Sequence, residues 1–174
     1  MFTVAVVGVA LVAGAAGCGS STRRLRSAAV GQPAPPFRLP NVRESESDVS
    51  LADVAGKPIV INFWASWCVP CRAESPALER FYEARRDPSF TILGIDSNDL
   101  SGDALGFVRK YGITYPQLRD GGGDFSQNEL GTTGVPESFL VDPRGKLVVH
   151  SIGPVSDKYL RSNVVPYLTG KAKQ

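Results

Sequence analysis

Cysteine and histidine, the residues that most often carry redox and metal chemistry, are scarce in this sequence. The 174 residues contain three cysteines and one histidine. Three cysteines are too few for a disulfide-stapled scaffold of this length. A single histidine excludes most histidine-based metal sites and every catalytic array that needs two. A site in this chain must therefore be built mainly from cysteine, aspartate, glutamate and backbone groups.

A strong net charge is lacking as well. The 19 basic and 17 acidic side chains give a formal charge of +2, which does not support nucleic-acid binding as the main function. Hydrophobic residues make up 43% and charged residues 21% of the chain, so the composition excludes wholesale disorder and a polytopic membrane protein. The length predicts one domain with a short additional segment.

The first residues of the chain predict export. Residues 2–17 are apolar or small, with Thr3 as the only polar side chain. This run is short for a permanent membrane span, which needs about 20 apolar residues, and it suits the apolar region of a signal peptide. The run ends in Ala15-Ala16-Gly17-Cys18, which resembles a bacterial lipobox, where lipid is attached to the cysteine and cleavage occurs just before it.

The small, polar and basic residues after Cys18 predict a tether. An uncleaved membrane anchor is the alternative to lipid attachment, and Cys18 could instead be a buried thiol or a third redox cysteine. Both anchored alternatives place the domain outside the cytoplasm, on the extracytoplasmic face of the bacterial cell membrane. The predicted segments are a lipoprotein-type signal peptide over 1–17, a lipid-anchored tether over 18–32 and a domain over 33–170.

Within the domain, strand-length apolar runs alternate with segments of helical spacing. The first two runs are apolar on both faces, as in central strands that are covered on two sides. Alternation followed by a hairpin predicts a mixed α/β sandwich. The predicted elements are strand 58–64, helix 69–86, strand 90–96, helix 103–111, a flexible loop over 120–124, strands 137–142 and 146–150 joined by a turn at 143–145, and a helix over 156–168 bent or broken at Pro166.

The motif Trp67-Cys68-Val69-Pro70-Cys71 lies between the first strand and the following helix. At a helix N-terminus, unpaired backbone N–H groups and the helix dipole stabilise a thiolate, which lowers the pKa of Cys68. Cys71 lies one turn further along the same helix face, close enough to form a disulfide. This spacing predicts an exposed attacking sulfur at Cys68 and a protected resolving sulfur at Cys71.

Other uses of a Cys-x-x-Cys pair fit this chain less well. Zinc needs four ligands, and only His150 and the remote Cys18 are available besides the pair. Haem attachment needs a histidine where Arg72 stands, and an iron–sulfur cluster lacks two thiolates. A structural disulfide is the remaining alternative, although a ring of four residues gains little loop entropy. We therefore predict redox exchange, with no metal and no cofactor besides the redox-active Cys68–Cys71 disulfide.

The sequence resembles the thioredoxin superfamily beyond this motif. Residues 60–71 (VINFWASWCVPC) are similar to its active-site strand and turn, Pro76 has the place of the kink-forming proline in the next helix, and Thr133-Gly-Val-Pro136 resembles the loop of its cis-proline. The resemblance implies a thioredoxin-like fold, with a central mixed β-sheet flanked by helices after an N-terminal extension. It also implies a cis Val135–Pro136 bond beside the cysteines, with the Val135 backbone free to pair with an extended substrate.

Within the superfamily, residues 31–170 are similar to the membrane-tethered ResA/CcmG(DsbE)/TlpA branch. The similarity includes the segments 31–39, 94–98 and 111–116, and Val135–Asp142 with Glu137 directly after the proline. It implies a thiol-disulfide oxidoreductase that acts on cysteine-containing proteins. Many members keep apocytochrome c reduced for haem attachment, with electrons from a membrane thiol donor of the CcdA/DsbD type. The alternatives are an exported thiol oxidase or isomerase of broad substrate range and a non-catalytic docking lipoprotein.

A proton relay is expected at Glu74. Thioredoxins usually have a buried aspartate six residues before the first cysteine, but Asn62 stands there and cannot titrate. Glu74, three residues after Cys71, occupies a position where the branch also has glutamate. A carboxylate near two thiols disfavours their ionisation and can carry the proton of the inner thiol. The alternative is an exposed helix glutamate without a role.

Four further side chains have predicted roles. Glu137 is expected to help select the substrate or to tune the thiols. Trp67 is expected to shield the cysteines and to offer a flat contact surface. Trp64 is expected in the core, and His150 on the surface of a strand.

The residues between the cysteines favour a reductant. Val69-Pro70 keeps the proline that thioredoxin has before its inner cysteine, and lacks the histidine of strongly oxidising motifs. On the scale where thioredoxin and DsbA differ by about 150 mV, we expect a reduction potential of about −200 to −300 mV. No Pro-x-x-x-Thr-x-x-Cys pattern of the peroxidase type surrounds either thiol.

Overall fold

The computed structural model describes residues 30–85 and 88–172. The predicted signal peptide, Cys18 and most of the predicted tether lie outside these ranges. Gly31 and Gln32, at the end of the predicted tether, hydrogen bond with Leu147. None of the helices in the described ranges is long and apolar enough to cross a membrane.

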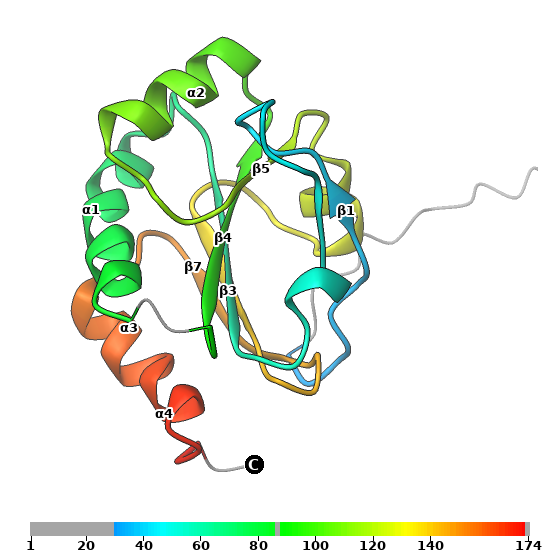
Figure 1. The fold of residues 1–174 in the computed structure, drawn as a ribbon, viewed down its shortest axis with the longest axis vertical. Helices are drawn as coiled ribbons and strands as arrows, with labels where there is room; N and C mark the ends of the chain where they lie inside the picture. The colour runs from blue at the N-terminus through cyan, green and yellow to red at the C-terminus, as the bar shows by residue number, and fades with distance from the viewer. Residues whose placement is uncertain (1–29, 86–87, 173–174) are drawn as a thin grey trace, which may run out of the picture.

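A five-stranded mixed sheet runs through the middle of the molecule (Figure 1). The strand order is β5-β4-β3-β6-β7. The three strands β3, β4 and β5 are parallel, whereas β6 is antiparallel to β3 and β7 is antiparallel to β6. This arrangement confirms the predicted fold class. The strands are β3 (Ile59–Trp64), β4 (Thr91–Ser97), β5 (Gln117–Asp120), β6 (Glu137–Val141) and β7 (Leu147–Ile152).

The four α-helices cover one face of the sheet (Figure 1). Their apolar side chains join those of the strands in one buried cluster, which we call the helix-side cluster. Trp64 belongs to it, as predicted, and stacks on Phe107 with ring centroids 4.4 Å apart. Pro76 lies inside the first helix, which continues through it. The helices are α1 (Val69–Glu83), α2 (Ser101–Lys110), α3 (Asp157–Asn163) and α4 (Val165–Leu168).

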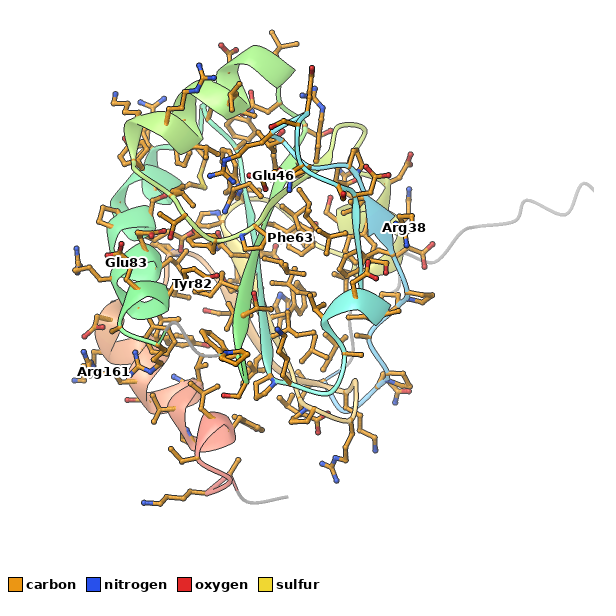
Figure 2. All side chains as sticks on the ribbon, viewed as in Figure 1. Arg38, Glu46, Phe63, Tyr82, Glu83 and Arg161 are labelled. Atoms are coloured by element: carbon orange, nitrogen blue, oxygen red, sulfur yellow. A yellow bond between two sulfur atoms is a disulfide. The ribbon has the colours of Figure 1, made fainter. Side chains whose placement is uncertain are left out.

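The N-terminal segment and one irregular helix cover the opposite face. They enclose a second buried cluster, the far-side cluster, in which Phe63 is completely buried and contacts Phe125 and Phe139. Figure 2 shows Phe63 in the middle of the molecule, with Arg38 and Arg161 at opposite edges. The covering elements are β1 (Arg38–Leu39), β2 (Val49–Ser50), the short helix η1 (Ala52–Val54) and the π-helix η2 (Asp124–Glu129).

Strand β5 was not predicted from the sequence. Its four residues, QLRD, have neither apolar alternation nor β-branched side chains. It forms because it pairs with β4 on one side and because the N-terminal segment binds its other side, where the Arg119 N–H donates to the Pro40 C=O and the Val42 N–H to the Gln117 C=O, both at 2.8 Å. Residues 117–120 therefore form a strand because they pair with distant segments, and not because of their own sequence pattern.

The predicted loop over 120–124 is a defined turn that leads into η2. The carboxylate of Asp120 accepts hydrogen bonds from the N–H groups of Phe125 and Ser126, at 3.2 and 2.8 Å. Near the C-terminus, the helix predicted over 156–168 is divided, but at Val164 between α3 and α4 and not at Pro166. Pro166 lies in the first turn of α4, where a missing N–H costs little.

Gly94 makes room for the buried side chain of Gln117, because a Cβ atom at position 94 would overlap the Gln117 amide. We expect Gly94→Ala to lower the free energy of unfolding by about 1–3 kcal/mol, the usual cost of overpacking. Gly106→Ala in α2, where a Cβ meets no atom within 4 Å, is the control and should raise it by about 0.5–1 kcal/mol. Urea titration measures both, and equal stabilities would contradict the steric argument.

Candidate active site

The two cysteines lie where β3 leads into α1. Cys68 is the N-cap residue of α1, and Pro70 lies in its first turn, where a helix does not need the missing N–H. The Cys71 N–H donates to the Cys68 Sγ at 3.2 Å. A backbone donor aimed at this sulfur, together with the positive end of the helix dipole, favours the thiolate form of Cys68.

Cys68 and Cys71 form a disulfide with an S–S distance of 1.98 Å and a Cα–Cα distance of 5.3 Å. Both belong to the helix-side cluster, and their exposed fractions are 3% and 0%. The expected exposure of Cys68 is thus wrong for the oxidised form, because the bond directs its sulfur toward the fully buried Cys71. The adjacent Trp67 and Val69 are exposed, so the surface next to the disulfide is apolar and open.

The connection between β4 and α2 holds the loop that precedes the cysteines. The Asp99 carboxylate accepts hydrogen bonds from the Ser66 N–H and Oγ–H, at 2.5 and 3.0 Å. The Trp67 Nε1–H donates to the Asn98 C=O at 3.2 Å, and Asn98 has a φ of +58°. Arg119 in turn donates to the Asp99 C=O. The sequence did not single out Asp99 or Asn98, because their partners lie more than thirty residues away.

Asp96 is a fully buried acid close to this loop. It ends the run of residues in β4 that pair with β3, with Trp64 opposite it on one side and Arg119 on the other. Burial, and then the charge of Asp99, raises the pKa of Asp96 to about 7. In the sequence, Asp96 stands out only as a member of the 94–98 segment, because a single aspartate at a strand end carries no signal of burial.

Glu74 is a residue of α1 and is buried between this helix and the sheet. Its Oε1 accepts from the Asn62 Nδ2–H at 2.9 Å, and its Oε2 accepts from the Val155 N–H at 2.8 Å. Burial raises the pKa of Glu74 to about 7, and the two hydrogen bonds oppose this shift only in part. The alternative of an exposed glutamate is therefore excluded. A carboxyl that titrates near neutrality has the property that the predicted proton relay requires.

The loop before β6 contains a cis Val135–Pro136 bond, as the resemblance implies. Glu137, the next residue, pairs with Phe63 near the end of β3, so the loop and Cys68 lie at the same end of the sheet. The Pro136 C=O accepts from the Gly153 N–H at 2.9 Å. In the described part of the chain, no hydrogen bond joins the Val135 backbone to another residue. Its N–H and C=O are therefore available to an extended peptide.

Glu137 supports this loop and does not face the substrate side. It is 1% exposed, and its Oε1 accepts from the Thr133 N–H, the Thr133 Oγ–H and the Gly134 N–H at 2.7, 2.7 and 3.1 Å. Its Oε2 lies 2.8 Å from the His150 Nε2. Burial alone would raise the pKa of Glu137, but the hydrogen bonds from Thr133 and His150 hold it below its usual value. The side chain of Glu137 thus contacts its own loop and His150, and its expected part in substrate selection or in tuning the thiols stays a prediction.

His150 lies on the edge strand β7, and the prediction that it is a surface residue holds only in part. Its side chain is only 20% exposed, and its ring stacks on Phe139 with centroids 4.2 Å apart. The reason is the pairing of β7 with β6, which sets His150 opposite Phe139. The hairpin was predicted, but the register that brings these two rings together was not.

Glu74 is expected to make stability fall as the pH rises. Its pKa of about 7 in the folded protein exceeds the ordinary value of 4.5, so the unfolded chain loses this proton first, and the free energy of unfolding decreases between about pH 4.5 and about pH 7. Glu74→Gln cannot ionise and should flatten this part of the curve in urea titrations. Glu44→Gln, at an exposed glutamate, should keep the wild-type slope. An unchanged slope in Glu74→Gln would contradict the raised pKa.

Comparison with known proteins agrees with this geometry. The AhpC/TSA family matches residues 30–150. The thiol:disulfide interchange protein HelX of Rhodobacter capsulatus is 34% identical over 148 residues, covering 84% of this chain and 81% of HelX. The thiol-disulfide oxidoreductase ResA of Bacillus anthracis is 32% identical over 134 residues, covering 75% of this chain and 74% of ResA.

Solved structures show the same similarity. The crystal structure of a secreted thiol-disulfide isomerase from Corynebacterium glutamicum has a TM-score of 0.70 and 25% sequence identity, covering 78% of this chain and 85% of that one. The chain belongs to the AhpC/TSA family of thioredoxin-like proteins, and its relatives there include thiol-disulfide oxidoreductases.

Proposed function

We propose that this chain is an exported thiol-disulfide oxidoreductase that reduces disulfides of client proteins through Cys68 and Cys71. The observation that carries the proposal is the Cys68–Cys71 disulfide at the N-terminus of α1, with the Cys71 N–H donating to the Cys68 Sγ. The same type of reaction is supported by the relatives HelX, a thiol:disulfide interchange protein, and ResA, a thiol-disulfide oxidoreductase. No cofactor besides the pair itself is needed for it.

The proposed exchange has two steps. In the first, the Cys68 thiolate attacks the client disulfide, so that a Cys68–client bond forms, the client S–S bond breaks, and one client sulfur leaves as a thiolate. In the second, Cys71 loses its proton and attacks the Cys68 Sγ, which closes the Cys68–Cys71 disulfide and releases the second client thiolate. Two electrons pass from the chain to the client. A membrane dithiol donor of the CcdA/DsbD type then reduces the pair again.

Glu74 is the proposed acceptor of the Cys71 proton. It lies one turn further along α1 and has a pKa of about 7, close to the pH at which a relay must both take up and release a proton. Both of its oxygens are held by uncharged donors, Asn62 and the Val155 N–H. No cation in these contacts favours its ionised form, and the carboxyl can therefore exist in either protonation state.

The client is proposed to bind as an extended segment across the cis-proline loop. The Val135 N–H and C=O offer backbone pairing, and the exposed indole of Trp67 offers a flat apolar surface next to Cys68. For the client we propose apocytochrome c, which must be reduced before haem attachment. The proposal of export, with a lipid anchor at Cys18, rests on the pattern of residues 1–18 and agrees with the secreted relative of known structure.

Trapping tests the reaction and the client together. Cys71→Ala keeps the attacking thiol but removes the thiolate that resolves the mixed disulfide, so client proteins should accumulate on Cys68. In a bacterium with exported cytochromes, we expect mass spectrometry of these adducts to identify apocytochrome c. Cys68→Ala is the matched control and should trap no client, because Cys71 is fully buried.

Other results of the trapping experiment are equally informative. A broad spread of secreted proteins would contradict a dedicated cytochrome c reductase and indicate a general oxidase or isomerase. If no adduct forms, thiol exchange itself is contradicted, and docking without catalysis becomes the better hypothesis.

The reduction potential tests the direction of electron flow. We expect a value of about −200 to −300 mV, in the range of thioredoxin and the glutaredoxins. Equilibration of the purified protein with dithiothreitol or glutathione buffers, followed by thiol alkylation, measures it. A value near −120 mV, that of DsbA, would identify an oxidant and overturn the proposed direction.

A further inference from the structure

One buried carboxylate organises the loop that carries the cis-proline. The Glu137 Oε1 receives three hydrogen bonds, from the N–H and Oγ–H of Thr133 and from the N–H of Gly134. Glu137 is the first residue of β6, so its backbone is anchored in the sheet while its side chain reaches back to the loop. These bonds fix the two residues directly before Val135. They therefore set the direction in which the Val135 backbone faces.

His150 holds the second oxygen of this carboxylate. Its Nε2 lies 2.8 Å from the Glu137 Oε2, and because an ionised carboxylate only accepts hydrogen bonds, Nε2 must be the donor. The His150 ring is itself fixed by stacking on Phe139, with an interplanar angle of 10°. In the β6–β7 register, His150 is opposite Phe139 and Ile152 is opposite Glu137. Glu137 and His150 are thus diagonal neighbours on one face, within reach of long side chains.

This pair is separate from the thiol chemistry. Phe139 belongs to the far-side cluster, whereas both cysteines belong to the helix-side cluster, so the pair and the disulfide lie on opposite faces of the sheet. Among the described residues, no hydrogen bond or ion pair joins His150 to either cysteine. A change at His150 should therefore leave the ionisation of Cys68 and the proton relay at Glu74 intact.

We propose that His150 is a positioning residue for client binding, which acts through Glu137 on the cis-proline loop. Without the His150 donor, one buried carboxylate oxygen loses its partner, and only the bonds from Thr133 and Gly134 hold the Glu137 side chain in place. The carboxylate is then less rigidly placed, so Thr133 and Gly134 are held less firmly, and the Val135 backbone is less well fixed in the direction that pairs with a client. This inference rests on the proposed function and adds a residue that determines client affinity.

Two substitutions at His150 separate its donor from its ring. His150→Phe keeps a flat ring against Phe139 but has no donor, whereas His150→Gln keeps an N–H donor without the ring. Ser151→Ala, at the next residue of β7, is the matched control. The full chain is assayed with dithiothreitol as reductant, on a disulfide-containing peptide and on cystamine, a small disulfide without a peptide backbone.

We expect His150→Phe to raise the KM for the peptide about tenfold, the effect of one lost hydrogen bond to a charged group. Its kcat, its rate with cystamine and the potential of the disulfide should not change. His150→Gln should restore most of the affinity, and Ser151→Ala should match the wild type. Amide hydrogen exchange at Gly134 should be faster in His150→Phe than in Ser151→Ala.

The inference is overturned if His150→Phe leaves the peptide KM and the exchange at Gly134 unchanged. It is equally overturned if cystamine reduction falls in parallel, because the effect would then be general. Should His150→Phe fail to fold, His150→Asn, whose shorter side chain cannot reach Glu137, takes its place with the same expected results. A wild-type protein that reduces neither substrate contradicts the proposed function itself, and the inference with it.

Discussion

The hydrogen bond from the Cys71 N–H to the Cys68 Sγ is the contact on which the proposed chemistry depends. It exists because β3 ends at Trp64 and α1 begins at Val69, which leaves Cys68 as the N-cap. A helix start presents unpaired N–H groups whatever the surrounding fold, and here they are directed at a sulfur. In the proposed function, the rest of the site orients this sulfur, accepts the proton of Cys71 or binds the client.

Two buried glutamates show how environment assigns different tasks to one residue type. Glu74, on the helix side of the sheet, meets only two neutral donors, and burial raises its pKa to about 7. Burial alone would raise the pKa of Glu137, but hydrogen bonds from Thr133 and from His150 hold it below the usual value. The first is suited to exchange a proton and the second to remain a fixed acceptor.

Sequence patterns predicted most of the elements, for a physical reason that also explains the failures. The strands β3 and β4 are central and covered on both faces, so their apolar runs are visible without knowledge of the fold. Strand β5 is short and polar, and its formation depends on β4 and on the Pro40–Val42 segment. Local sequence patterns also do not predict the register between β6 and β7. The sequence therefore gives no sign that His150 stacks on Phe139.

What the sequence by itself determined is local: a cysteine pair at helical spacing after a buried strand, a glutamate one turn further, and a proline before the next strand. Each depends only on neighbours in the chain. Tertiary structure alone decided the contacts between distant residues, such as the Val155 N–H on Glu74, 81 positions away, and Asp99 on Ser66, 33 positions away. Burial and hydrogen-bond partners, which set pKa values and loop shape, arise only when such segments pack together.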